Sequence, residues 1–177
     1  MAGHDRLTPE GRRFFKEIEE LKKLQLRVGY QHGAKSKKRN GAAADEGPGA
    51  AAGEGSGAKN GKKEPADIAD IATWNEVGAG SIPKRPFMRQ SVERNTDKIS
   101  AMCKAQLHRI ARGEADAQDI LQKLGAMQKG FIENQIEVGE FVENAKSTIA
   151  RKKSEKPLID TGRMRQSVNF TIVPKGG

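Results

Sequence analysis

The chain has 177 residues and a formal net charge of +9, and 31% of its residues are charged whereas only 5% are aromatic. This length suits one modest core, so we expect residues 1–177 to form a single domain. The one cysteine, Cys103, excludes an intrachain disulfide, and no apolar stretch reaches the length of a membrane span. We therefore expect a protein made in the cytoplasm that has no contact with a membrane.

The first predicted elements are a helix and a strand. Thr8 followed by Pro9 predicts a helix start, because threonine caps helices and proline is tolerated at the first helical position. We expect this helix over residues 9–23, with an apolar stripe formed by Phe14, Ile18 and Leu21. Residues 24–30 alternate between apolar and polar or small side chains, which predicts a half-buried strand.

The next segment, residues 31–64, is rich in Gly, Ala and Lys and has almost no large apolar residue. It offers too little apolar surface to offset the entropy cost of ordering it. We expect a long, flexible Gly/Ala/Lys-rich insert that is an appendage of the core.

Two prolines mark the helices that follow the insert. Pro65 opens a short predicted helix that ends at Gly78, a plausible C-cap. Its buried face consists of Ile68, Ile71, Ala72 and Trp74. Pro86 opens a long predicted helix that ends near Gly113. Its apolar stripe consists of Met88, Val92, Ile99, Cys103 and Ile110.

Another helix begins near Asp116 and Asp119, whose negative charge suits a helix N-terminus. Its apolar positions are Ile120, Leu124, Met127, Phe131 and Ile136. Ser147 then predicts the cap of one short helical turn, and Pro157 ends whatever precedes it.

The chain closes with a turn and a strand. Asp160 and Thr161 are both good caps for a helical turn in "TGRMRQSV", after which Val168, Phe170 and Ile172 alternate as a strand. We expect this strand to pair with residues 24–30. A small antiparallel sheet, additional helices and a long Gly-rich loop together predict the α+β class.

Nucleotide-binding motifs are matched only loosely. The stretches "GPGAAA" (47–52) and "GEGSGA" (53–58) neither follow a strand directly nor open an amphipathic helix. In "SGAKNGKK" (56–63), Ser56 and Lys63 stand where a phosphate-binding loop needs Gly and Ser or Thr. We expect no cofactor.

Catalytic and metal-binding patterns are also weak. His4, His32 and His108 lack the spacing with carboxylates or cysteine that a metal site requires. Cys103 on an apolar stripe is expected to be a small core residue, and the glutamates of residues 133–143 are expected to form a solvated acidic face. We therefore expect no metal, no catalytic residue and no enzyme.

Two phrases carry a family resemblance. "DIADIATWNEVGAGSIPKRPFMRQSVERN" (67–95) and, well downstream, "STIARKKSEKPLIDTGRMRQSV" (147–168) together resemble the neck or tail-completion proteins of tailed bacteriophages, in the minor tail, head–tail joining class. The matching positions are Asn75, Glu76, Gly78, Ile82, Pro83, Arg85, Pro86, Phe87, Arg89, Pro157, Leu158, Asp160, Thr161, Gly162, Met164, Ser167 and Val168. Val77 stands where the family has an aromatic residue, and the insert at 31–64 is longer than the family leads us to expect.

The resemblance implies a small α+β domain in which a short antiparallel sheet packs against a long helix. It also implies a non-enzymatic virion structural protein that completes the tail or joins head to tail. Such a protein would form a homo-oligomeric ring, with a hexamer favoured, and would contact other neck, connector, tail-tube or sheath proteins. Genome DNA would pass through the ring without sequence-specific binding. The expected location is the virion neck, and the host cytoplasm during assembly.

The first phrase contains three predicted interface residues. Arg85 and Arg89 flank a stiff turn in which Phe87 is placed to anchor the helix in the core. Their guanidinium groups can bind the Glu76 carboxylate or carboxylates of a neighbouring subunit. A purely structural role is an equally open alternative for this motif and for the motif of the second phrase.

The second phrase contains two more predicted interface residues. Arg163 and Arg165 lie on either side of Met164, so they point outward when Met164 points inward. Leu158 and Phe170 are expected to join Met164 in the core. In a ring, these arginines would face the acidic 133–143 segment of the next subunit.

One other class of function fits part of the sequence, and a second does not. Positive charge is concentrated in residues 82–113 and 146–177, whereas residues 114–145 are net negative. This excess favours contact with polyanions, so the alternative is a basic nucleic-acid-binding module, although no recognition motif accompanies the charge. A small hydrolase would need converging carboxylates or histidines, which the sequence does not indicate.

Overall fold

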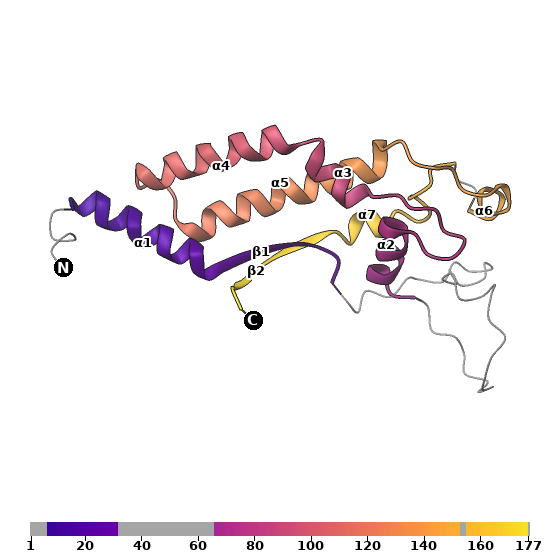
Figure 1. Ribbon diagram of the computed structural model, residues 1–177, viewed down its shortest axis with the longest axis horizontal. Coiled ribbons are helices and arrows are strands. Elements are labelled where there is room, and N and C mark those ends of the chain that lie inside the picture. Colours follow the sequence, from indigo (N-terminus) through magenta and orange to yellow (C-terminus); the bar gives the residue numbers. More distant parts are fainter. Residues whose placement is uncertain (1–6, 32–65, 153–154, 177) are drawn as a thin grey trace, which may run out of the picture. The chain divides into compact units, whose positions relative to one another are not determined.

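The computed structural model describes residues 7–31, 66–152 and 155–176, which form seven helices and two strands. In chain order these are α1 (Pro9–Lys23), β1 (Leu24–Gly29), α2 (Ile68–Val77), α3 (Phe87–Glu93), α4 (Thr96–Ala111), α5 (Ala117–Val138), α6 (Lys146–Lys152), α7 (Arg163–Gln166) and β2 (Asn169–Pro174) (Figure 1). The predicted α+β class is confirmed. The insert at 31–64, apart from residue 31, and the predicted helix start at Pro65 lie outside the described residues.

The chain divides into two compact units that are interleaved along the sequence. Unit 1 comprises Met1–Gly29, Ser91–Phe131 and Asn169–Gly177, and unit 2 comprises Tyr30–Gln90 and Ile132–Val168. The boundary between them falls within α3 and α5. Because neither unit is one continuous stretch, this division does not decide between one domain and two, and the single domain stays a prediction.

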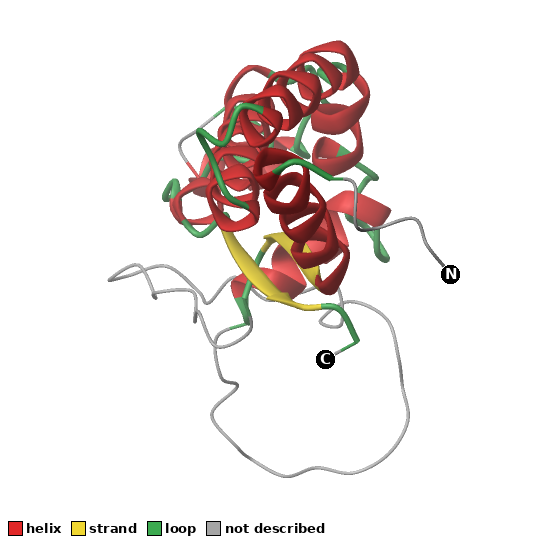
Figure 2. Cartoon of the chain, turned by 90° about the vertical axis from the view of Figure 1, so that its left-hand side faces the viewer, coloured by secondary structure: helices red, strands yellow, loops and turns green. Residues whose placement is uncertain are grey.

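The sheet of unit 1 is one antiparallel pair of strands. The two strands β1 and β2 are drawn in yellow in Figure 2. In their register, Val28 lies opposite Phe170 and Leu26 lies opposite Ile172. Exposure alternates along most of β1, as expected for a strand with one covered face. The predicted pairing of the last strand with residues 24–30 is confirmed.

The long helix behind this sheet is α5. A Cβ atom on Gly125 of α5 would overlap the ring of Phe170 in β2. The missing side chain at Gly125 therefore lets the aromatic ring of the strand lie directly against the helix backbone.

The rest of unit 1 is held by apolar packing. Ile110, Ala115 and Ile120 are buried, and the partly buried Phe14, Leu21 and Leu124 pack against them. The hydroxyl of Thr8 accepts a hydrogen bond from the Gly11 N–H at 3.2 Å and so caps α1, as predicted. Local capping and helical periodicity therefore produced the expected α1.

The single helix predicted from Pro86 to Gly113 is wrong, because it is broken into α3 and α4. The Asn95 side chain donates to the Ser91 carbonyl at 2.8 Å, and the Thr96 hydroxyl donates to the Val92 carbonyl at 3.0 Å. Asn95 itself adopts φ −118° and ψ 14°, outside the helical region. Side chains that bond the preceding turn interrupt the helix, and Val92 is left 47% exposed instead of continuing the apolar stripe.

The short helices of unit 2 start at other residues than predicted. α2 is capped by Asp67 and ends at Gly78, whose φ of 81° confirms the predicted glycine C-cap. Ser147 lies inside α6, so it is not the cap. The N-cap of α7 is Gly162 at φ 73°, rather than Asp160 or Thr161. This left-handed conformation suits glycine and places the polar turn before the helix.

Candidate functional site

Arg85 lies inside unit 2 rather than on its surface. It is 3% exposed, and its guanidinium donates to the carbonyls of Val142 (2.8 Å) and Glu143 (3.3 Å). It also donates to the side-chain oxygens of Asn75 and Asn144, both at 3.0 Å. Burial lowers the pKa of this guanidinium from its ordinary value.

These contacts correct the predicted role of Arg85. Its guanidinium binds carbonyl and amide oxygens instead of the Glu76 carboxylate, and its own chain covers it. A neighbouring subunit therefore has no access to it, and Arg85 is a structural residue in this fold.

Asn144 extends the contacts of Arg85 to the second phrase. Its side-chain amide donates to the Pro157 carbonyl at 3.3 Å. Sequence reasoning missed this residue because it lies in the irregular segment between α5 and α6, where neither periodicity nor a cap pattern marks it. Asn75, by contrast, was among the family-like positions, although no partner was assigned to it.

Glu76 holds the start of α3. Its two carboxylate oxygens accept hydrogen bonds from the backbone N–H groups of Met88 (2.9 Å) and Arg89 (3.0 Å). These donors lie in the first turn of α3, where N–H groups have no partner within the helix and negative charge is favoured. Glu76 thus caps a helix across the "IPKRPF" turn, whereas the Arg89 side chain is exposed and stays a candidate for an interface.

The two arginines around Met164 differ from one another. Arg165 is 40% exposed at its side chain and pairs with the Glu137 carboxylate at 2.5 Å. The Arg163 Nη1 atom is buried and has no hydrogen-bond partner among the described residues, while the residue as a whole is half-buried, so an interface role for Arg163 stays a prediction. Leu158 is buried and Met164 is half-buried, as expected for core residues. Part of the acidic 133–143 segment is therefore already neutralised within the chain.

Tyr30 lies beside the anchoring residue Phe87. The two rings meet edge to face with their centroids 6.3 Å apart. The Tyr30 hydroxyl is buried without a hydrogen-bond partner among the residues that the structure describes. Burial, and then the charges of Glu76 and Glu133, raise the pKa of this hydroxyl well above its ordinary value.

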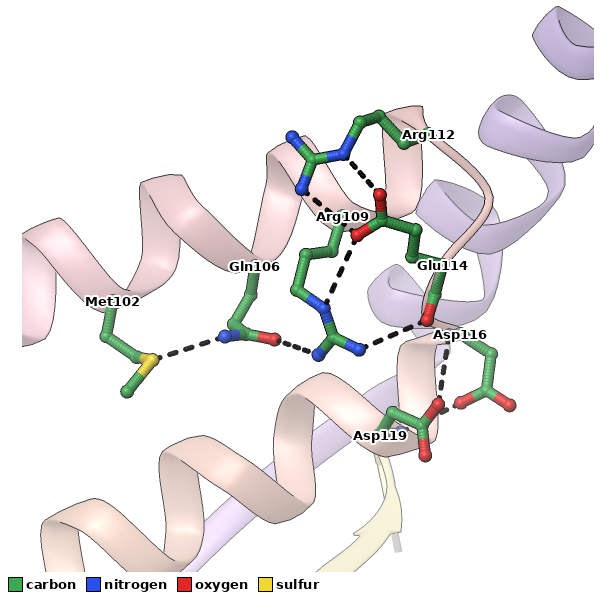
Figure 3. Close-up of polar contacts among 7 residues, drawn as sticks. All are labelled: Met102, Gln106, Arg109, Arg112, Glu114, Asp116 and Asp119. Atoms are coloured by element: carbon green, nitrogen blue, oxygen red, sulfur yellow. Dashed lines mark hydrogen bonds and ion pairs between the residues drawn. The ribbon is translucent and has the colours of Figure 1, made fainter.

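A separate polar cluster lies at the turn between α4 and α5 in unit 1 (Figure 3). The Arg109 guanidinium donates to Gln106 Oε1 at 3.0 Å and to the Glu114 carbonyl at 3.1 Å, and the Gln106 amide donates to Met102 Sδ at 3.3 Å. Arg112 pairs with the Glu114 carboxylate at 2.5 Å. This hydrogen bond lowers the pKa of Glu114 and raises that of Arg112.

The same turn starts α5 with reciprocal caps. The Asp119 N–H donates to Asp116 Oδ1 at 2.8 Å, and the Asp116 N–H donates to Asp119 Oδ2 at 3.4 Å. Glu17 of α1 adds a third acceptor, because its carboxylate takes the Ala117 N–H at 3.0 Å. The carboxylates of this cluster thus accept hydrogen bonds from backbone N–H groups at the start of α5 or pair with arginines. The cluster therefore holds the turn and is not a candidate catalytic site.

In the part of the chain that the structure describes, no three His, Cys, Asp or Glu side chains gather as a metal ion would need. Within the same residues, no helix has the length and apolar character needed to cross a membrane.

Comparison with protein-family models, with curated proteins and with solved structures found no match for this chain.

Proposed function

We propose that this chain is a non-enzymatic virion structural protein that completes the tail, or joins head to tail, at the neck of a tailed bacteriophage. One observation supports this proposal beyond the sequence resemblance. The two phrases that carry the resemblance lie far apart in the sequence, yet Arg85 of the first phrase binds Asn144, which in turn binds Pro157 of the second. Family-like positions that meet in one hydrogen-bonded network are consistent with a shared fold in unit 2.

The use of the polar side chains also favours a structural role. Arg85 donates hydrogen bonds to backbone carbonyls and so fixes the segment before α6. Glu76 accepts hydrogen bonds from backbone N–H groups and so fixes the start of α3. Polar side chains that bind the backbone of their own chain fix the shape of the surface that a partner would meet. We propose that the partners are further copies of this chain in a ring, favoured as a hexamer, and the neighbouring neck, connector, tail-tube or sheath proteins.

The proposed location is the virion neck, after assembly in the host cytoplasm. Genome DNA would pass through the ring without sequence-specific binding, because the charge of the chain is not accompanied by a recognition motif.

The decisive experiment removes the chain from the phage. Particles made without it should accumulate as filled heads and separate or incomplete tails in electron micrographs, and supplying the wild-type chain from a plasmid should restore complete virions. A tag on the chain should be located by gold labelling at the neck. Complete, infectious particles made in its absence would refute the proposal.

A basic nucleic-acid-binding module is the second candidate. The described residues of unit 1 contain fourteen Lys and Arg against nine Asp and Glu, whereas unit 2 has nine of each. A salt titration separates the two candidates, because phosphate contacts make the logarithm of affinity fall linearly with the logarithm of salt concentration. We expect no saturable DNA binding at physiological salt, and tight binding with a steep slope would favour the module instead.

A further inference from the structure

An exposed segment of unit 2 combines apolar and acidic side chains. Residues 138–143, here called the 138–143 segment, are the last residue of α5 and the five residues that follow it. Val138 and Val142 are 60% and 61% exposed, and Glu140 and Glu143 are also exposed. Neither of these two carboxylates forms an ion pair with another described residue. The segment thus exposes two apolar and two acidic side chains within six residues.

The 138–143 segment is exposed but fixed. Arg85 donates to the carbonyls of Val142 and Glu143, and the Gly139 N–H donates to the Gln135 carbonyl at 2.9 Å. A Cβ on Gly139 would overlap the Phe141 ring, so the backbone there lies tightly against its own side chains. A surface held in place before binding loses less entropy when a partner docks on it.

Helix α1 of unit 1 exposes a matching surface of opposite charge. Phe15 is 53% exposed, and the exposed cations Arg12 and Lys16 lie beside it on the helix. The later cations of α1 are balanced, since Lys22 pairs with Glu19 and Lys23 pairs with Glu20. Arg12 and Lys16 form no ion pair with a carboxylate of the described residues. We call Arg12, Phe15 and Lys16 the α1 face.

From these surfaces we infer that the 138–143 segment of one copy binds the α1 face of a second copy of this chain. Phe15 would pack against the exposed valines while Arg12 and Lys16 meet Glu140 and Glu143. The two surfaces differ, so the contact is heterologous and, repeated with closure, builds a ring. The inference rests on the proposed neck function and replaces Arg163 and Arg165 as the site of the acidic–basic contact between subunits.

Charge reversal on each surface tests this contact. Glu140→Lys with Glu143→Lys, and separately Arg12→Glu with Lys16→Glu, should each weaken association of the purified chain by at least about tenfold, because like charges then face each other. Light scattering and sedimentation over a range of concentrations measure the change. Matched controls are Asp70→Lys in α2 and Lys104→Glu in α4, which are exposed and lie outside both surfaces. These controls should associate like wild type, and circular dichroism should show that every variant is folded.

Mixing the two reversed variants gives the sharpest result. One variant is basic on both surfaces and the other is acidic on both, so each surface of one complements the opposite surface of the other. We expect the equimolar mixture to recover assemblies in which the two variants alternate. A contact within one chain would not be restored by mixing, so failure of the mixture to recover would overturn the inference.

The remaining outcomes separate this contact from the function itself. If wild type forms a ring and both reversed variants assemble normally, the contact is wrong while a neck protein with another interface stands. If wild type stays monomeric at every concentration, the contact is again wrong, and the labelling of virions decides the function independently.

Discussion

The two units differ in the interactions that stabilise each of them internally. Unit 1 relies on an apolar cluster around Ile110 and Ile120 and on the ladder between β1 and β2. Its ion pairs, such as Lys22 with Glu19, are exposed, and exposed pairs contribute little to stability. Unit 2 also buries apolar side chains, among them Phe87, Leu158 and Val168, and it adds a buried charge, because the Arg85 guanidinium binds four oxygen acceptors.

This difference teaches that charge has opposite roles in the two units. In unit 1 the ion pairs of Lys22 and Lys23 lie on the surface and can be changed at small cost in stability, whereas Glu17 and Arg109 hold the start of α5 and the turn before it. In unit 2 the charge of Arg85 is buried, and it determines the path of the segment that leads to α6. Removal of a buried polar partner should therefore cost more in unit 2 than any comparable change in unit 1.

The largest expected effect is at Arg85. Replacement Arg85→Met leaves neutral oxygen acceptors buried without donors, and each acceptor left unsatisfied should lower the free energy of unfolding by about 1–3 kcal/mol. Arg85→Lys keeps the charge but cannot reach all four acceptors, so it should recover only part of this loss. Denaturant unfolding followed by the fluorescence of Trp74, the only tryptophan, measures both variants. If Arg85→Met lowers the free energy of unfolding by less than about 1 kcal/mol, the buried charge of unit 2 does not contribute more to stability than the surface charges of unit 1.

A close approach in unit 1 gives the next effect. Gly125→Ala places a methyl group in the ring of Phe170 and should destabilise the chain by about 1–3 kcal/mol. Gly130 in the same helix is the matched control, because a Cβ there meets nothing within 4 Å. Gly130→Ala should stabilise the chain by about 0.5–1 kcal/mol. Thermal unfolding that shifts in the same direction for both variants would contradict this reading of the sheet and α5.

A smaller effect is expected at Glu76. Glu76→Ala removes the acceptor for two N–H groups in the first turn of α3 and should cost about 1 kcal/mol. Glu93→Ala at the other end of α3 is the control and should change stability little, since Glu93 is exposed. Equal unfolding midpoints for the two variants would show that the cap contributes nothing.

The smallest expected effect is at Tyr30, where a hydroxyl is buried without a described partner. Tyr30→Phe should leave stability unchanged or raise it by up to about 1 kcal/mol, because no hydrogen bond is lost. A stability decrease above about 1 kcal/mol would reveal a partner for this hydroxyl.

The pH dependence of the free energy of unfolding gives a second test of the buried Tyr30 hydroxyl. The folded-state pKa of Tyr30 lies above the ordinary value of 10.0, mainly because of burial. Above pH 10 the unfolded chain loses this proton while the folded chain keeps it, so the free energy of unfolding should fall as pH rises. Tyr30→Phe should remove this contribution. Since Tyr30 is the only tyrosine, tyrosinate absorbance of the wild type reports its titration directly.

Sequence reasoning succeeded where local signals agree. Thr8 and Pro9 predicted the start of α1, and the alternation of Val168, Phe170 and Ile172 predicted β2 and its pairing with β1. It failed at Asn95, since a continuous apolar stripe does not show that side chains will bond the preceding turn. It also misplaced the cap of α7, because three consecutive residues were each suited to that position.

By itself the sequence determined the helices and strands whose caps and apolar periodicity lie within a few neighbouring residues, and it determined the α+β class. Only the tertiary structure decided where the charged groups go. The burial of Arg85, the capping of α3 by Glu76 and the pairing of Arg165 with Glu137 each join residues that are distant in the chain. The same guanidinium can face solvent or donate to buried carbonyls, and its free energy in each place depends on partners that local sequence does not specify.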